Sequence, residues 1–262
     1  MARPDRACGG APDALPDRFG HRLPKVRRGA SADTPAVAGG TLESPTRPGR
    51  RSDVGGYDEA TVLFDLDGVL VDSTESIRAG LTAWAVERGV DVGAVLEHHH
   101  GRTDVDLVRL FAPHLDPLTE APRIEDHEAA AGDGVRGVPG ARELLTELDA
   151  RGRPWAIVTS GSDRIARSRI ATAELPLPRV LVTADQVTAG KPHPAPYLLG
   201  AERLGVAPAR CVVVEDSVSG VRSGLDAGMP VVAVASTTGT EDLAHATTVV
   251  ADLEAVAELL LP

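Results

Sequence analysis

Short, continuous apolar runs alternate with segments of helical periodicity through most of the chain after residue 57. Apolar runs bounded by turn residues predict strands that are covered on both faces. We expect strands at Thr61–Asp65, Trp155–Thr159, Val180–Thr183, Cys211–Glu215, Val231–Ala235 and Thr248–Ala251. Helices are predicted at Ala141–Ala150, Asp163–Ala171, Pro196–Leu204, Val218–Ala227 and Leu253–Leu261. This alternation favours an α/β fold, a Rossmann-like parallel sheet with helices on both faces.

One interval in this pattern is too long for a single connection. About 90 residues separate the first predicted strand from the second, far more than one crossover needs. Apolar residues recur at helical spacing in Thr74–Arg88 and again in Val105–Phe111. We therefore expect a small α-helical cap at residues 74–136, inserted after strand 1, and a core formed by residues 57–73 and 137–262.

Residues 1–56 differ in composition from the rest of the chain. They hold ten Lys and Arg against six Asp and Glu, with seven Pro and nine Gly. A segment so rich in chain-breaking residues buries too little apolar area to offset the entropy lost on ordering, so we expect a disordered basic tail. The alternative explanation is a start site assigned too far upstream, with the true beginning near Val54.

The composition excludes several classes of protein. From residue 57 the chain holds 17 Lys and Arg against 32 Asp and Glu, an acidic balance that argues against nucleic acid as a partner. No apolar stretch is long enough to span a membrane, and the first residues lack the apolar segment of a secretory signal. The two cysteines, Cys8 and Cys211, exclude a disulfide framework and favour a cytoplasmic location.

Two carboxylates stand directly after the first predicted strand, Asp65 and Asp67, and Gly68 follows them. Ligands of an open α/β sheet bind at the carboxyl ends of the strands, so both acids are expected at a site. Acids at this spacing can share a divalent cation, or one can attack while the other transfers a proton. A simpler alternative is a pair of acids that begins a loop or caps a helix.

Three further segments have matching chemistry. Ser160 and Gly161 offer a hydroxyl and a backbone amide to a phosphate oxygen. Lys191 is one of two lysines in the chain and the only one after residue 57, and its ammonium can neutralise a phosphate. Glu215 and Asp216 end another apolar run and add oxygen ligands for a cation such as Mg²⁺. Each segment alone fits a turn, a solvated lysine or a helix terminus, but four in one chain indicate a common site.

In this order, the four segments resemble the four motifs of the haloacid dehalogenase superfamily, and the helical insertion resembles its small C1-type cap. The resemblance extends from Ala60 to about Pro262. It implies a catalytic core in which Asp65 is the nucleophile that forms an aspartyl-phosphate. Asp67 would act as general acid and then as general base. Dehalogenases of the superfamily lack this second acid, so halide displacement is disfavoured.

The resemblance also implies how the phosphoryl group and a metal ion are held. Ser160, Gly161 and Lys191 would bind the phosphoryl group. The implied Mg²⁺ ligands are Asp65, the backbone carbonyl of Asp67 and Asp216, with Glu215 acting through water. The cap would open to admit substrate and close to exclude water, with hinges near Val71–Ser73 and Gly137–Gly140.

Two segments indicate the class of substrate. GKPHPAPYL at residues 190–198 is similar to a stretch of sugar and polyol phosphatases in the superfamily, including 2-deoxyglucose-6-phosphate and glycerol-phosphate phosphatases. The cap segment HGRT at residues 100–103 also looks like theirs. It makes His100 and Arg102 candidates for contact with a substrate hydroxyl or a second anionic group; a surface arginine is the simpler alternative.

We therefore predict a Mg²⁺-dependent phosphatase, a phosphoric monoester hydrolase, that acts as a monomer on a small phosphorylated sugar or polyol. A β-phosphoglucomutase-type isomerase is the nearest alternative, because it shares the fold, the cap and all four motifs. The cap offers Arg102 and Arg109 but no lysine to anchor a second phosphate, which favours hydrolysis. A non-catalytic phosphate-binding protein is the second alternative.

Overall fold

The computed structural model describes residues 57–130 and 134–262, so the prediction of a disordered tail at residues 1–56 lies outside the described residues. Its main sheet is parallel, with the strand order β5-β4-β1-β6-β7-β8. The strands are β1 (Thr61–Phe64), β4 (Trp155–Val158), β5 (Leu181–Val182), β6 (Cys211–Glu215), β7 (Val231–Val234) and β8 (Thr248–Val250). All six match predicted apolar runs, and β1 lies between β4 and β6.

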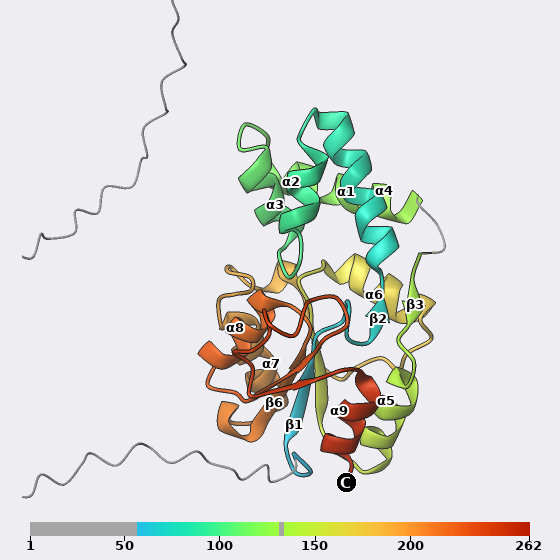
Figure 1. The fold of residues 1–262 in the computed structure, drawn as a ribbon, viewed down its shortest axis with the longest axis vertical. Helices are drawn as coiled ribbons and strands as arrows, with labels where there is room; N and C mark the ends of the chain where they lie inside the picture. The colour runs from blue at the N-terminus through green and yellow to red at the C-terminus, as the bar shows by residue number, and fades with distance from the viewer. Residues whose placement is uncertain (1–56, 131–133) are drawn as a thin grey trace, which may run out of the picture. The chain divides into compact units, whose positions relative to one another are not determined.

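Helices cover both faces of this sheet (Figure 1). One face packs against α5 (Ala141–Ala150), α6 (Asp163–Thr172) and α9 (Leu253–Leu260), and the other against α7 (Ala195–Leu204) and α8 (Val218–Asp226). Short 3₁₀ turns lie at Ala184–Gln186 and Pro208–Arg210.

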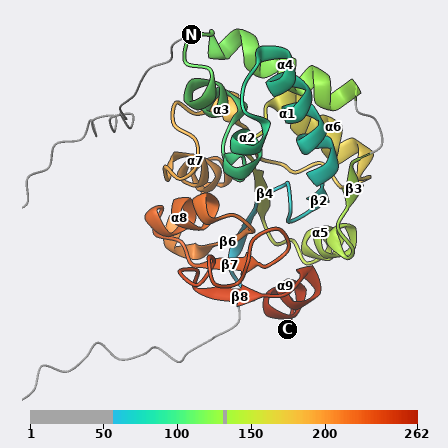
Figure 2. The same cartoon turned by 45° about the horizontal axis from the view of Figure 1, so that its top comes forward.

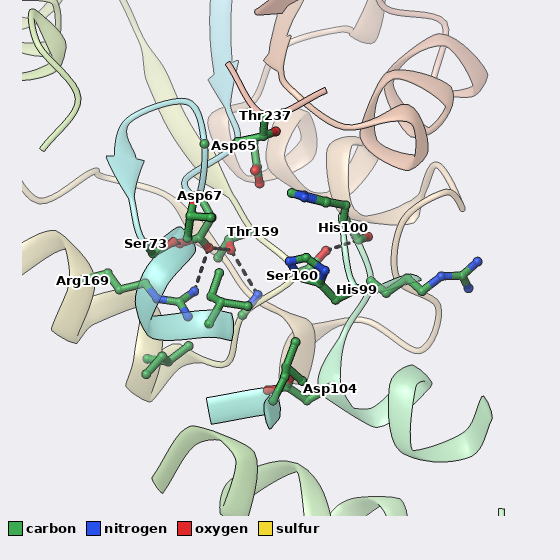
Figure 3. Close-up of a pocket in the computed structure, with 18 of the residues that line it drawn as sticks. Asp65, Asp67, Ser73, His99, His100, Asp104, Thr159, Ser160, Arg169 and Thr237 are labelled. Carbon is green, nitrogen blue, oxygen red and sulfur yellow. Dashed lines mark hydrogen bonds and ion pairs between the residues drawn. The ribbon is translucent and has the colours of Figure 1, made fainter. Parts of the chain in front are cut away.

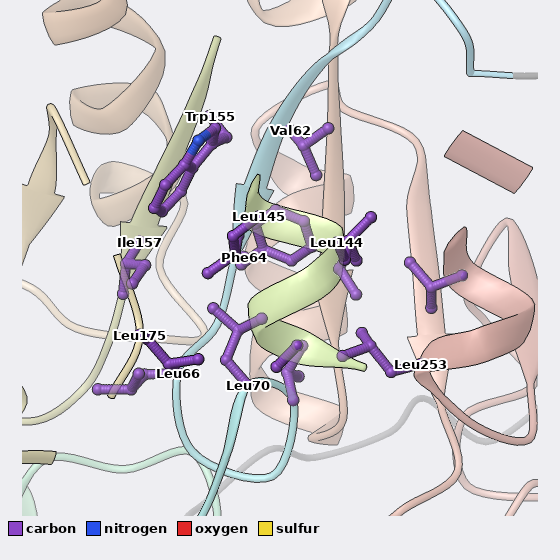
Figure 4. Close-up of a cluster of buried hydrophobic side chains, with 14 of the residues drawn as sticks. Val62, Phe64, Leu66, Leu70, Leu144, Leu145, Trp155, Ile157, Leu175 and Leu253 are labelled. Carbon is purple, nitrogen blue, oxygen red and sulfur yellow. The ribbon is translucent and has the colours of Figure 1, made fainter. Parts of the chain in front are cut away.

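Alternate residues of the central strand serve the two hydrophobic clusters. Val62 and Phe64 pack with Leu145 in the first cluster (Figure 4), whereas Leu63 packs with Tyr197 in the second. Because successive side chains of a strand point to opposite faces, an apolar run without alternation is what a strand covered on both faces requires.

A helical cap follows the first strand, in agreement with the predicted fold class. Its helices are α1 (Thr74–Arg88), α2 (Val92–His98), α3 (Asp104–Phe111) and α4 (Pro117–Ala130). They enclose a separate hydrophobic cluster around Trp84, Leu107 and Ile124. Figure 2, in which the cap is turned forward, shows α1 and α4 side by side.

Two short strands connect the cap to the core. β2 (Val71–Asp72) enters the cap and β3 (Arg136–Gly137) leaves it. They pair antiparallel, with Val71 opposite Gly137 and Asp72 opposite Arg136. The two junctions of the cap therefore lie next to each other, at the positions where the sequence predicts the hinges.

Within the described ranges, no helix combines the length and the apolar character needed to cross a membrane.

Candidate active site

Asp65 and Asp67 lie at the carboxyl end of β1, in the middle of the sheet. The N–H of Asp65 donates to the Val214 carbonyl at 2.9 Å, which extends the pairing of β1 with β6. Gly68 follows with φ +80°, a conformation that favours glycine. A Cβ at Gly68 would lie 2.0 Å from Oδ2 of Asp216. This glycine therefore lets the acid that follows β6 approach the turn that follows β1.

Lys191 is buried between two of the predicted acids. Its Nζ donates to Oδ1 of Asp65 at 2.6 Å, to Oε1 of Glu215 at 2.6 Å and to the Val158 carbonyl at 3.0 Å. Burial alone would lower the pKa of Lys191, but the carboxylates of Asp65 and Glu215 together raise it above its usual value. The side chain is therefore a fixed positive charge beside Asp65.

Opposing effects of the surrounding groups set the pKa of Asp65. Burial raises the pKa of Asp65 to about 7, with Glu215 and Asp67 adding to the rise and Lys191 opposing it. Among the described residues only Lys191 donates a hydrogen bond to the Asp65 carboxylate, and it does so to Oδ1. Among the described residues, no group donates to its second carboxylate oxygen, Oδ2.

Both oxygens of Glu215 accept hydrogen bonds from the protein. Oε1 accepts from Lys191 and from the Tyr197 hydroxyl at 2.8 Å. Oε2 accepts from the N–H of Asp216 at 3.0 Å and from the N–H and Oγ of Ser217 at 3.1 and 3.0 Å. Burial would raise the pKa of Glu215, but Lys191 and these donors lower it. Glu215 thus holds Lys191 in place.

One group of carboxylates fits a cation. Asp65, Glu215 and Asp216 each place an oxygen within 4.8 Å of the others, and all three residues are buried. Thr237 Oγ1 donates to Oδ2 of Asp216. Burial raises the pKa of Asp216 well above its usual value, and Glu215 and Asp65 add to the rise. Mg²⁺ takes oxygen ligands and is usually bound through one or two carboxylates while it keeps several waters, so this donor set fits the expected metal.

Ser160 and Gly161 lie just beyond the carboxyl end of β4 and line the same cavity as Asp65. The Ser160 hydroxyl donates to the Gly101 carbonyl of the cap at 3.3 Å. The Gly161 N–H donates to Thr159 Oγ1 at 3.0 Å. Both predicted phosphate-binding residues are therefore beside the acids, with their donors directed to protein acceptors in this structure.

His100 and Arg102 belong to the cap loop between α2 and α3, and both line the cavity. Arg102 is exposed. Between them, Gly101 has φ +66°, and a Cβ there would lie 1.9 Å from Ser219 Oγ and 2.6 Å from Ser217 Oγ. The glycine of the HGRT segment therefore allows the cap loop to touch the first residues of α8.

Arg169 of α6 is a buried residue that the motifs do not single out. It donates to Oδ2 of Asp67 at 2.8 Å and to Oε2 of Glu128, on cap helix α4, at 2.5 Å. Ser73 donates to Oδ1 of Asp67 at 2.6 Å. The signal in the sequence is its position: Arg169 follows Ala166 by three residues, on the stripe of α6 that faces the core.

A small cavity of about 90 Å³ lies between the core and the cap. Its core side includes Asp65, Asp67 and Thr237, and its cap side includes His99 and Asp104. Figure 3 shows Asp104 at the opposite end of the cavity from Asp65 and Thr237. The site thus has a cluster of charged groups on the core side and a separate polar wall supplied by the cap.

The parallel sheet, the inserted cap and the four strand-end segments agree with the resemblance to haloacid dehalogenases, and the comparison with protein families supports the same assignment. A family model described as haloacid dehalogenase-like hydrolase matches residues 59–228. The chain belongs to this family, which confirms the resemblance found in the sequence. Within the family it is a phosphatase, as its curated relatives show.

Three relatives illustrate the likeness. The chain is 45% identical over 197 residues to hexitol phosphatase A of Escherichia coli strain K12, which covers 74% of this chain and 91% of that one. It is 34% identical over 186 residues to phosphoglycolate phosphatase of Xylella fastidiosa strain 9a5c, with coverages of 65% and 77%. It is 33% identical over 194 residues to 2-deoxyglucose-6-phosphate phosphatase 1 of Saccharomyces cerevisiae, with coverages of 66% and 79%.

Solved structures share the fold. CbbY of Rhodobacter sphaeroides, in complex with xylulose-(1,5)bisphosphate, superposes with a TM-score of 0.69 at 23% identity, over 77% of this chain and 99% of that one. β-Phosphoglucomutase of Clostridium difficile superposes with a TM-score of 0.66 at 20% identity, over 76% and 96%. At these identities the likeness concerns the fold alone.

Proposed function

We propose that this protein is a Mg²⁺-dependent phosphatase that hydrolyses a small sugar or polyol phosphate through an aspartyl-phosphate intermediate. The observation that supports this most directly is the contact of Lys191 with Asp65 at 2.6 Å. One oxygen of the Asp65 carboxylate is held beside a permanent positive charge, and the other has no donor among the described residues. That is the arrangement a nucleophile needs to meet an anionic phosphoryl group.

In the first half of the reaction, the Asp65 carboxylate attacks phosphorus and the bond to the substrate oxygen breaks. The carboxyl group of Asp67 gives its proton to that oxygen, so the polyol leaves as a neutral alcohol. Asp67 is held for this transfer by Ser73 at 2.6 Å and by Arg169 at 2.8 Å.

In the second half, the Asp67 carboxylate takes a proton from a water molecule whose oxygen attacks phosphorus. The bond between phosphorus and Asp65 breaks, which releases inorganic phosphate and restores both carboxyl groups. Lys191, Ser160 and Gly161 bind the phosphoryl oxygens during both steps, and the last two would exchange their present protein acceptors for these oxygens.

Mg²⁺ would be held by Asp65 and Asp216 together with the backbone carbonyl of Asp67. When bound, it supplies positive charge that offsets the charge of the transferring phosphoryl group. The protein prepares this position by burying the acids and by orienting Asp216 through Thr237. The water-mediated contact of Glu215 stays a prediction, since its oxygens here hold Lys191 and the start of α8.

Two observations support a small polyhydroxylated substrate. The named relatives include a hexitol phosphatase and a 2-deoxyglucose-6-phosphate phosphatase. The cavity above Asp65 holds about 90 Å³, below the roughly 300–1,000 Å³ of sites for drug-sized ligands. His100 and Arg102 line this cavity from the cap, where they would contact the part of the substrate that is not transferred.

The proposal is tested by measuring phosphate release by the purified full chain from a panel of phosphorylated sugars and polyols with Mg²⁺. We expect turnover of hexitol or glycerol phosphates, and a loss of on the order of 10⁴-fold in Asp65→Asn. Asp226→Asn is a matched control, because in the described part of the chain Asp226 pairs only with Arg222, on the surface.

Two results would overturn the assignment. Phosphate release that survives Asp65→Asn would exclude Asp65 as the nucleophile. Conversion of β-glucose-1-phosphate to glucose-6-phosphate faster than any phosphate release would identify the chain as a β-phosphoglucomutase-type isomerase.

A further inference from the structure

The cap side of the cavity carries acids that the proposed chemistry does not use. We propose that Asp104 is a specificity-determining residue: it hydrogen-bonds a hydroxyl group at the far end of the substrate and disfavours substrates that carry a carboxylate there. The inference rests on the proposed function, since it concerns the non-transferred part of the substrate in the same cavity.

The position of Asp104 in the cavity supports this role. Asp104 is the first residue of α3, directly after the N-cap Thr103, whose side chain accepts from the N–H of Asp106. The cap of the helix is thus satisfied by Thr103 and leaves the Asp104 side chain for another role. Asp104 lines the cavity together with Asp65, and Figure 3 places it at the far end from the nucleophile. The occupant of this cavity is the substrate, so Asp104 faces its non-transferred end.

The Asp104 carboxyl group also lacks a partner in the described part of the chain. Among residues 57–130 and 134–262, no group donates a hydrogen bond to the Asp104 carboxyl oxygens or forms an ion pair with them. The nearby Arg169 is already engaged by Asp67 and Glu128. The Asp104 carboxyl group is half-buried in the cavity wall, and a substrate hydroxyl would give it the hydrogen-bond partner that it lacks.

The charged groups around Asp104 also support this role. The Arg169 guanidinium pairs with two carboxylates, those of Asp67 and Glu128. The groups near Asp104 therefore carry no excess positive charge. Burial raises the pKa of Asp104 to about 8, and Glu128 adds to the rise while Arg169 opposes it. A second anion placed here would increase this unfavourable interaction. Arg102, a cap cation that lines the cavity, is exposed.

These features of Asp104 would let the cavity distinguish a substrate hydroxyl from a substrate carboxylate. A hydroxyl group can both donate and accept, so it can pair with either form of the Asp104 carboxyl. A carboxylate on the substrate can only accept, and it also brings a charge that the wall repels. Sites that hydrogen-bond a substrate hydroxyl reject analogues that lack it, and a repulsive element strengthens such discrimination.

Two pairs of substrates isolate this difference. Glycerol-3-phosphate and 3-phosphoglycerate have the same carbon chain and differ at the far carbon, a CH₂OH group in one and a carboxylate in the other. Glucitol-6-phosphate and 6-phosphogluconate differ in the same way. For wild type we expect kcat/KM to favour the alcohol of the better-used pair by about 10-fold or more.

Two substitutions of Asp104 separate hydrogen bonding from charge. At pH 9, above the raised pKa of Asp104, Asp104→Asn keeps a donor and an acceptor and removes the charge, so there we expect it to raise kcat/KM for the carboxylate member several-fold and to change kcat/KM for the alcohol little. Asp104→Leu removes both, so kcat/KM for the alcohol falls by about 10-fold or more. Asp106→Asn is the matched control on the same helix, because Asp106 pairs with Thr103 and Arg109.

p-Nitrophenyl phosphate, which has no hydroxyl at its far end, reports whether the phosphoryl-transfer groups remain intact in each variant. An unchanged ratio of alcohol to carboxylate turnover in Asp104→Asn, with p-nitrophenyl phosphate turnover preserved, would overturn the inference and leave the proposed function standing. If neither variant folds, a wild-type ratio below about 3-fold overturns the inference. No turnover of any alcohol in either pair, beside turnover of other phosphate esters, would contradict the proposed function itself.

Discussion

The guanidinium of Arg169 donates to the carboxylate of Asp67 at 2.8 Å, and its other terminal nitrogen donates to Glu128 of the cap. One side chain of the core therefore contacts both the proposed general acid and the cap. Because Arg169 touches neither phosphorus nor the leaving oxygen in the proposed mechanism, we regard it as a positioning residue. Its contact with Glu128 requires α4 of the cap to lie against the core, since Glu128 belongs to α4.

Replacement of Arg169 should affect the chemical step more than binding. We expect Arg169→Met to lower kcat by about 10–100-fold, within the range for loss of one positioned group in proton transfer, with a smaller change in KM. Arg169→Lys should recover part of the loss. Steady-state kinetics on the best polyol phosphate checks this split.

Arg164→Met provides the control. Arg164 lies on the same helix and also reaches the cap, where it pairs with Glu125 and Asp126, but it does not contact Asp67. Equal losses of kcat in the Arg164 and Arg169 variants would show that docking of the cap, and not the orientation of Asp67, is what Arg169 provides.

Lys191 should matter for stability as well as for turnover. Removing its charge in Lys191→Met leaves Asp65 and Glu215 buried without their shared partner, which costs about 3–5 kcal/mol for a broken buried pair. Urea unfolding without Mg²⁺ measures this loss. Adding Glu215→Gln to Lys191→Met should return part of it; a double variant no more stable than Lys191→Met would contradict the pairing.

Gly101 should be needed for closure of the cap loop on the core. Gly101→Ala places a Cβ 1.9 Å from Ser219 Oγ, so we expect kcat/KM to fall by about 10-fold, the size of a ~1.4 kcal/mol penalty on closure. Gly89→Ala is the control, since Gly89 has the same φ of +66° and nothing within 4 Å of the added Cβ.

The two glycine variants should lose similar thermal stability, because both strain the backbone, but only Gly101→Ala should lose activity. Ser219→Ala in the Gly101→Ala background should restore part of kcat/KM. Equal activity of the two glycine variants would show that the contact between the loop and α8 is not required.

Divalent cation should bind to the acids of the site and stabilise the folded chain. We expect chelation to reduce phosphate release to background and Mg²⁺ to restore it. By mass action, Mg²⁺ at a hundredfold excess over its Kd should add about 2.7 kcal/mol to the free energy of unfolding. Asp216→Asn should remove most of this Mg²⁺-dependent rise in Tm, and an undiminished rise would place the ion elsewhere.

The stability gained by replacing Asp104 should depend on pH. The pKa of Asp104 is raised from 3.8 to about 8, so its favourable contribution is complete below pH 4 and is lost as the pH rises through 8. Burial is the largest cause of this rise in pKa; Glu128, Glu125 and Asp67 add to it and Arg169 opposes it.

Asp104→Asn does not ionise, so its Tm should exceed that of wild type more at pH 9 than at pH 5. An increase in this difference of about 2–4 °C corresponds to ~1 kcal/mol in a domain of this size. Thermal unfolding of both proteins at the two pH values measures it. A difference that is the same at both would show that the Asp104 carboxyl is not perturbed.

The strands could be predicted from the sequence because burial on both faces leaves a continuous apolar run, as in Cys211–Glu215, which matches β6 residue for residue. The positions of Asp65, Lys191 and Asp216 followed from the motifs. The sequence did not indicate that both carboxylate oxygens of Glu215 accept hydrogen bonds from the protein, because the donors come from separate elements of the chain.

Helix α4 shows why the cap was harder to predict. Its buried residues include Glu120, Glu125 and Glu128, and an internal Pro122 interrupts the pattern. Each buried acid pairs with an arginine from another element, namely Arg88, Arg164 and Arg169. Hydrophobic periodicity does not detect a face made of ion pairs. For the same reason Arg169, the partner of Asp67, could be found only by asking why an arginine lies on an apolar stripe.

The pairing of β2 with β3 has a consequence for exchange of the cap between proteins. The chain leaves the core and returns to it through two strands joined at two residue pairs, so the ends of the inserted segment are only about 5 Å apart. Closing a loop over so short a gap costs little extra as the insert grows. A different helical module grafted between Asp72 and Arg136 would have to match this spacing and supply its own contacts to the core in place of those of Glu128 and Gly101, and the specificity proposed for the cap would be exchanged with it.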